Sequence, residues 1–206
     1  MQRAPIIILM GFICSALLLY AWYKRMEPSW GSSPPATLHG DSPSDDLGPV
    51  AEFFLIERNG NTVTLKDLHG KVWVASFLFT RCCTGCPRIS ADLLQLQKDL
   101  ADTEGVVIVS FSVDPEHDTP AVMAEYARHF KQDPSRWTFL TGEKALLTEV
   151  GLRSFKLNPV DGSMGHSTRF TLVDRNGRIR GYYISGDDGF MPKLMHDIRQ
   201  LEQERA

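Results

Sequence analysis

Three of the four cysteines lie within one short segment, "FLFTRCCTGCPRIS", which spans residues 77–90. Clustered thiols can form a structural disulfide, a redox-active dithiol or a metal-binding pair. A bridge across one helical turn closes a very small loop and stabilises a fold little through chain entropy. Strain also disfavours a bond between the adjacent Cys82 and Cys83. We therefore expect a functional dithiol in this segment.

Two cysteine pairings are compatible with the spacing. Cys83 and Cys86 form a C-x-x-C motif, the spacing of thioredoxin-type dithiols. Cys82 and Cys86 are one helical turn apart, which places both sulfurs on one helix face. Pro87 suits the first position of a helix, so Cys86 is expected at a helix N-terminus, where the macrodipole stabilises a thiolate. Both pairings gain from this dipole, so it does not distinguish them.

A histidine far along the chain offers a further ligand. His166, in "SMGHSTRFTLVD", immediately precedes a predicted hairpin. Two thiolates and one imidazole form a soft, three-ligand set suited to Cu(I) and able to take Cu(II). Zinc can use the same ligands, although structural zinc sites normally have four. This histidine favours a copper site over a purely redox-active dithiol.

The elements that must position these side chains are predicted within residues 50–206. Near-continuous apolar runs at 71–79 and 106–112 are typical of strands covered on both faces. Helices are predicted over residues 87–102, 119–130, 143–155 and 188–203, with a short strand at "WTFL". Asn-Gly pairs at 59–60 and 176–177 predict hairpin turns, and Thr119 before a proline predicts a helix cap.

The order of these elements describes a mixed α/β sheet. A reactive cysteine pair where a central strand meets a helix predicts the thioredoxin-like fold, a mixed sheet flanked by helices. Functional groups in such sheets gather beyond the carboxyl ends of the strands, and Cys82 is predicted to lie there.

The segment before this domain is of a different kind. Residues 4–23 form a run without a charge, long enough to cross the roughly 30 Å hydrocarbon core of a bilayer, so residues 1–26 are predicted to be an uncleaved membrane anchor with one transmembrane helix. Residues 27–49 are rich in proline, serine and glycine, which predicts a linker. The formal net charge of -3 offers no basic surface, so nucleic-acid binding is not expected.

Three blocks, "FLFTRCCTGCP", "FSVDPEHDTP" and "GHSTRFTLVDRNGRIRGYY", resemble the Sco/SenC family of copper chaperones in order and spacing. The resemblance implies that Cys82, Cys86 and His166 are the copper ligands. It also implies copper delivery to, or cysteine reduction in, the CuA-bearing subunit of cytochrome c oxidase. The resemblance further implies one membrane anchor with the domain outside the cytoplasm, which charge counting leaves undecided. Because no transit peptide precedes the anchor, the expected setting is the bacterial inner membrane with the domain in the periplasm.

Two residues depart from the family pattern, which often has histidine and proline where Arg81 and Cys83 stand. Arg81 is either a solvated side chain or a charge that stabilises thiolates. Cys83 is a spare thiol, a third sulfur ligand or the resolving partner of Cys86. The last alternative describes a thiol-disulfide oxidoreductase or a redox sensor in place of a metallochaperone.

Two aspartates in the block "DPEHDTP" allow two interpretations. Asp114 and Asp118 suit turn and cap chemistry in a loop that follows a buried strand. Because this loop is expected near the cysteines, they are also candidates for supporting the site or recognising a partner.

Overall fold

The computed structural model describes residues 46–81, 86–157 and 168–204. The predicted anchor at residues 4–23 lies outside these ranges. In the part of the chain that is described, no helix is both long and apolar enough to cross a bilayer.

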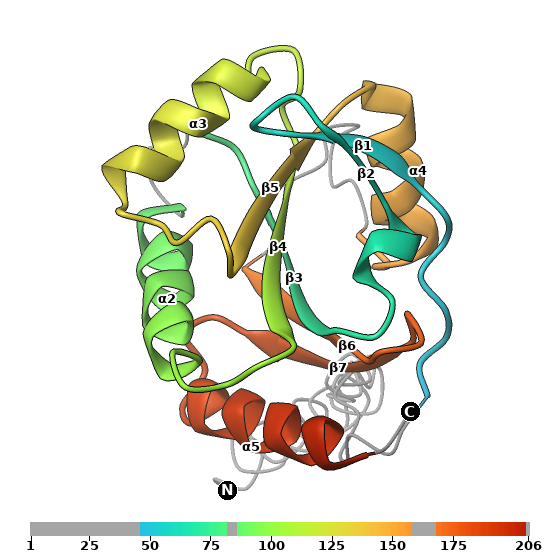
Figure 1. Ribbon diagram of the computed structural model, residues 1–206, viewed down its shortest axis with the longest axis vertical. Coiled ribbons are helices and arrows are strands. Elements are labelled where there is room, and N and C mark those ends of the chain that lie inside the picture. The colour runs from blue at the N-terminus through green and yellow to red at the C-terminus, as the bar shows by residue number, and fades with distance from the viewer. Residues whose placement is uncertain (1–45, 82–85, 158–167, 205–206) are drawn as a thin grey trace, which may run out of the picture. The chain divides into compact units, whose positions relative to one another are not determined.

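The described chain forms one mixed sheet of seven strands with helices around it (Figure 1). The strands are β1 (Phe54–Glu57), β2 (Thr62–Thr64), β3 (Val72–Leu78), β4 (Val106–Ser112), β5 (Trp137–Thr141), β6 (Arg169–Val173) and β7 (Ile179–Ile184). The helices are α2 (Cys86–Asp99), α3 (Pro120–His129), α4 (Lys144–Arg153) and α5 (Phe190–Gln203), with a 3-10 turn η1 (Leu65–Leu68). The strand order is β2-β1-β5-β4-β3-β6-β7. This arrangement confirms the predicted thioredoxin-like α/β fold.

The central strands are buried on both faces, as their apolar runs predict. β3 pairs in parallel with β4, and β4 pairs in parallel with β5. Every residue of β3 is buried, and successive side chains enter opposite cores. Trp73 and Phe77 belong to the core on one face, whereas Val74 and Leu78 belong to the core on the other.

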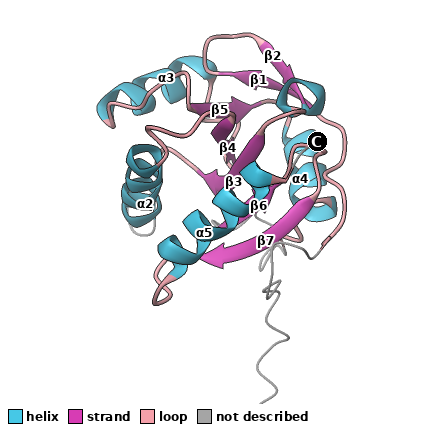
Figure 2. Cartoon of the chain, turned by 60° about the horizontal axis from the view of Figure 1, so that its bottom comes forward, coloured by secondary structure: helices cyan, strands magenta, loops and turns pink. Residues whose placement is uncertain are grey.

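Helices cover the two faces unequally. Leu93 of α2, Met123 of α3 and Ile198 of α5 share one core, and Leu147 of α4 lies in the other. Figure 2 shows these helices outside the strands. The helical spacing seen in the sequence accounts for α2, because Ile89, Leu93, Leu96 and Leu100 are each at most 1% exposed. Burial of each such side chain contributes about 1.5–3 kcal/mol relative to exposure.

Both predicted hairpins turn at their Asn-Gly pairs. β1 pairs antiparallel with β2, and β6 with β7. Gly60 has φ +88° and Gly177 has φ +73°, in the left-handed region that glycine adopts without steric cost.

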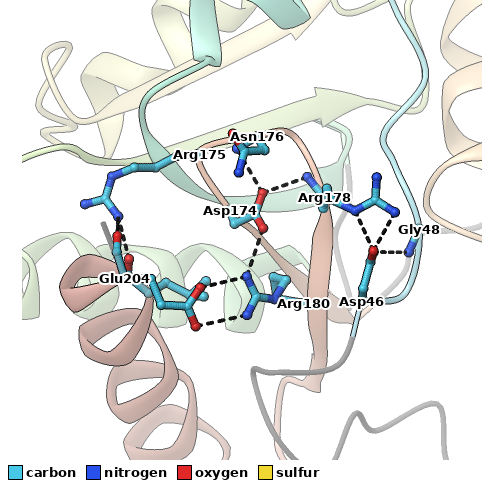
Figure 3. A network of polar contacts seen from close by, with 9 residues as sticks. Asp46, Gly48, Asp174, Arg175, Asn176, Arg178, Arg180 and Glu204 are labelled. Atoms are coloured by element: carbon cyan, nitrogen blue, oxygen red, sulfur yellow. Dashed lines mark hydrogen bonds and ion pairs between the residues drawn. The ribbon is translucent and has the colours of Figure 1, made fainter. Parts of the chain in front are cut away.

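The chain before β1 is fixed to the free edge of β7 (Figure 3). The backbone N–H of Leu47 donates to the carbonyl of Ile179 at 2.9 Å, and the N–H of Ile179 donates to the carbonyl of Gly48 at 2.9 Å. The Asp46 carboxylate accepts from Arg178 Nε at 2.6 Å and from the Gly48 N–H at 3.0 Å. The last residues of the predicted linker therefore join the sheet.

The turn between β6 and β7 and the first residues of β7 also contact the end of α5 (Figure 3). Arg180 pairs with Asp174 at 2.9 Å and with Glu204 at 3.0 Å. Arg175 donates to the carbonyl of Leu201, among the last carbonyls of the helix, at 2.5 Å. Because Val173 pairs with Trp73 near the start of β3, this turn lies at the opposite end of the sheet from the cysteine segment.

Candidate metal centre

The predicted ligands are Cys82, Cys86 and His166. Cys86 is the first residue of α2, whereas Cys82 and His166 lie outside the described residues. Among the side chains that are described, no three from His, Cys, Asp and Glu gather closely enough to hold a metal ion. The ligand set therefore stays a prediction. The structure does show where the strands and the helix that adjoin the predicted ligands lie.

These elements meet at one end of the sheet. β3 ends at Leu78, four positions before Cys82, and the backbone of Cys86 begins α2. β6 is antiparallel to β3, with Ala75 paired to Thr171, so the start of β6 lies beside the end of β3. The carboxyl ends of parallel strands are where functional groups gather in open α/β sheets.

Asp118 holds the end of β3 in place. Its fully buried carboxylate accepts from the Thr80 hydroxyl at 2.6 Å and from the Thr80 backbone N–H at 3.2 Å. It also accepts from the Ser112 hydroxyl at 2.7 Å, at the end of β4. A buried carboxylate is tolerated when several donors satisfy it, and here they do so. Asp118 thus joins two strand ends just before the cysteine segment.

Asp114 has a different role in the same loop. Its carboxylate pairs with Arg81 at 2.5 Å, and this hydrogen bond raises the pKa of the guanidinium. The Arg81 side chain is 60% exposed, so solvent screens the pair. The Asp114 carbonyl accepts from the Asp118 N–H at 2.8 Å, which is the turn chemistry that the sequence predicts. The positive charge of Arg81 therefore already has a carboxylate partner.

The first turns of α2 are tied to α3. Ser90 lies four positions after Cys86, so both residues share one helix face. The fully buried Ser90 hydroxyl and the Tyr126 hydroxyl are hydrogen-bonded at 2.6 Å. This contact fixes the N-terminal part of the helix that begins at Cys86.

Arg169 joins the two ends of the 158–167 segment. It is the first residue of β6, and its guanidinium donates to the carbonyls of Phe155 and Lys156, which precede that segment. The guanidinium also lies 4.6 Å from the centre of the Tyr182 ring, a cation–π contact. Burial lowers the pKa of the Arg169 guanidinium. One side chain therefore sets the separation of the ends of the segment that contains His166.

The sequence did not indicate these supporting residues. Thr80, Ser112, Ser90 and Tyr126 are common residue types in ordinary helix and strand patterns. The sequence offers Asp118 both as a turn or cap residue and as a residue that supports the site or recognises a partner. The α3 cap is instead Thr119, whose side chain accepts from the Val122 N–H.

Comparison with known proteins gives a family match that covers most of the chain. The model of a family described as SCO1/SenC matches residues 43–201. A relative described as "SCO1 protein homolog", from Bacillus subtilis (strain 168), is 34% identical over 167 residues, covering 78% of this chain and 86% of the relative.

Solved structures share the fold. The structure of BsSco, described as a member of the Sco family of cytochrome c oxidase assembly proteins with a disulfide switch, has a TM-score of 0.70 and 33% identity. It covers 78% of this chain and 98% of that chain. The structure of Bradyrhizobium japonicum ScoI with copper bound has a TM-score of 0.61 and 28% identity, covering 75% of this chain and 99% of that chain.

Proposed function

The chain belongs to the SCO1/SenC family, and from this premise we propose that it is a copper metallochaperone. Its cargo is Cu(I), with Cu(II) as a second accepted state, and its ligands are Cys82, Cys86 and His166. The observation that carries the proposal is the meeting of β3, α2 and β6 at one end of the sheet. These three elements lead into the three ligands, which are far apart in the sequence.

The partner proposed is the CuA-bearing subunit of cytochrome c oxidase. The described relative BsSco is a member of a family of assembly proteins for that enzyme, which supports this choice. A three-ligand site leaves the copper under-coordinated, so a ligand of the partner can add before a ligand of the chaperone leaves. Binding needs both cysteines as thiolates, because an oxidised pair offers no charged sulfur ligand.

A second function, thiol-disulfide chemistry at the same cysteines, is favoured by one observation. BsSco is described with a disulfide switch, and the chain has a cysteine cluster that allows two pairings. In this alternative, Cys86 pairs with Cys82 or Cys83, and the dithiol reduces cysteines of the partner or reports redox state. One thiolate attacks a disulfide of the partner, forming a mixed disulfide while one partner sulfur leaves as a thiolate. The second thiol then attacks the mixed disulfide, which releases the partner as a dithiol and leaves the chain's own cysteine pair oxidised to a disulfide.

The proposed setting is the bacterial inner membrane. Residues 4–23 are the proposed single membrane span, with the domain in the periplasm and residues 27–49 as the linker between them. The length of the uncharged run supports the membrane span, and the proposed orientation is the one expected of the family.

Copper titration of the full-length chain in detergent tests the proposal. The reduced wild-type chain is expected to bind one copper ion, His166→Ala to lose most of the affinity, and Cys83→Ser to retain it. An oxidoreductase instead keeps its activity in His166→Ala, since thiolate attack needs no imidazole. Copper binding that survives His166→Ala but disappears in Cys83→Ser would overturn the ligand assignment.

A further inference from the structure

Ser185 makes hydrogen bonds to two segments that are distant in sequence. It follows the last residue of β7 and is 7% exposed. Its backbone N–H donates to the carbonyl of Thr168 at 2.8 Å. Its hydroxyl donates to Asp92 Oδ2 at 2.5 Å. A single residue therefore connects the residue that directly precedes β6 with the middle of α2.

Both connected segments lead into proposed copper ligands. Asp92 lies on α2, six positions after Cys86, which is less than two helical turns. Thr168 follows His166 by two positions and directly precedes β6. The Thr80–Asp118 contact fixes the residues that follow β3 to the end of β4 but does not reach β6. Ser185 joins the cysteine helix, through its hydroxyl, to the residue before β6, through its backbone N–H.

A second contact reinforces the same connection. Gly186 has φ +102°, a conformation that favours glycine, and a Cβ placed there would lie 2.3 Å from Nη2 of Arg88. The guanidinium of this α2 residue thus occupies the space above the Gly186 backbone. The end of β7 therefore contacts α2 at two successive positions, by a hydrogen bond at Ser185 and by close packing at Gly186.

We propose that Ser185, through Asp92 and Thr168, is a positioning residue that sets the separation between the cysteine and histidine halves of the copper site. This inference rests on the proposed function. A metal site binds tightly when its ligands are held in place before the metal arrives, because less ordering accompanies binding. Without the hydroxyl, α2 keeps its apolar core contacts but can shift relative to the start of β6.

The experiment measures copper binding and folding stability separately in the full-length chain. Ser185→Ala and Asp92→Ala are each expected to weaken copper binding about ten-fold, the lower end of the effect of residues that orient metal ligands. The double variant is expected to be no weaker than either single variant, since one bond is lost in all three. Ser185→Thr keeps the hydroxyl and is expected to restore the affinity. Affinity is read by competition with a chromophoric Cu(I) chelator, and ligand geometry by the thiolate-to-Cu(II) absorption band.

Thr64→Ala is the matched control. The Thr64 hydroxyl donates to Asp67 Oδ2 at 2.7 Å, the same kind of bond, at the last residue of β2 on the opposite edge of the sheet. This variant should lose stability in urea but keep wild-type copper affinity and absorption.

The outcomes separate the two proposals. If the wild-type chain binds copper and Ser185→Ala binds equally well, or no more weakly than Thr64→Ala, the positioning role is wrong and the metallochaperone stands. If the reduced wild-type chain binds no copper, the proposed function fails and the positioning role fails with it. If Ser185→Ala does not fold, Asp92→Ala and the rescue by Ser185→Thr decide between these outcomes.

Discussion

Asp118 and Thr80 are joined through both hydrogen-bond donors of the threonine. The hydroxyl lies 2.6 Å and the backbone nitrogen 3.2 Å from the same carboxylate oxygen. Thr80 stands two positions before Cys82, so this is the last buried contact described before the cysteines, and only the exposed Arg81–Asp114 ion pair among the described contacts lies closer to them. The Ser112 hydroxyl donates a hydrogen bond to the other carboxylate oxygen of Asp118. Asp118 is therefore expected to hold the backbone at the end of β3 in place.

Asp118→Asn is expected to lower the free energy of unfolding by about 3 kcal/mol. The amide presents an N–H group toward buried donors and leaves at least one of them unsatisfied. Urea unfolding followed by circular dichroism measures the change. Asp114→Asn is the control, because its ion pair with Arg81 is exposed and should contribute less than about 1 kcal/mol. Equal losses in the two variants would contradict the assignment.

The Ser90–Tyr126 contact is expected to act as one unit. Ser90→Ala and Tyr126→Phe each remove one hydroxyl of the pair and should lower stability by about 1 kcal/mol. In a double-mutant cycle the two losses should not add, with a coupling energy of about 1 kcal/mol. Fully additive losses would show that each hydroxyl acts through another partner.

Replacement of Arg169 is expected to weaken both folding and copper binding. Arg169→Met removes the donors to the Phe155 and Lys156 carbonyls and should cost about 2 kcal/mol in urea unfolding. Arg169→Lys should recover only part, because an ammonium is a compact point charge without the flat guanidinium that lies over the Tyr182 ring. Tyr182→Leu is the control, since it removes the ring contact and keeps the carbonyl contacts. Copper affinity that falls in Tyr182→Leu as much as in Arg169→Met would contradict a role through the His166 segment.

The attachment of residues 46–49 to β7 is expected to weaken only at acid pH. Hydrogen bonds from Arg178 and the Gly48 N–H hold the pKa of Asp46 below its ordinary value. A carboxylate whose pKa is lowered by folding stabilises the folded state to its full extent at pH values above the ordinary aspartate pKa of about 3.9. This contribution is lost as the pH falls through the pKa of the folded state.

The Gly48 amide resonance reports this titration directly, because its N–H donates to Asp46. Its NMR shift should titrate with a midpoint below about 3.9, and Arg178→Gln should move the midpoint upward. An unchanged midpoint in Arg178→Gln would show that the ion pair does not hold Asp46.

Most of the fold could be predicted because its signals are local. The apolar runs of β3 and β4, the spacing of the α2 leucines and the Asn-Gly turns each depend on neighbouring residues only. Thr119 caps α3 with Pro120 in the first turn, as its sequence predicts. Such signals fix elements and, through connection rules, much of the topology.

The contacts that support the candidate site could not be predicted in the same way. Asp118 and Thr80 are 38 positions apart, and Asp92 and Ser185 are 93 positions apart. Serine, threonine and aspartate also have strong local uses in turns and caps, and those uses explain the pattern around Asp118 equally well. Only the three-dimensional arrangement shows which use applies.

Residues 46–49 illustrate the same limit. Their composition is that of a linker, and their pairing with β7 is made largely by backbone groups, which any sequence possesses. The Asp46–Arg178 contact joins positions 132 residues apart.

With the proposed membrane anchor, the attachment of this segment at the β6–β7 turn affects how far from the bilayer the proposed copper ligands lie. Residues 46–49 are attached at the end of the sheet where β3 begins, and Cys82 follows the other end of β3, whose seven residues span about 23 Å. A change in the length of the proposed linker is therefore expected to move the domain relative to the membrane without altering the proposed ligands.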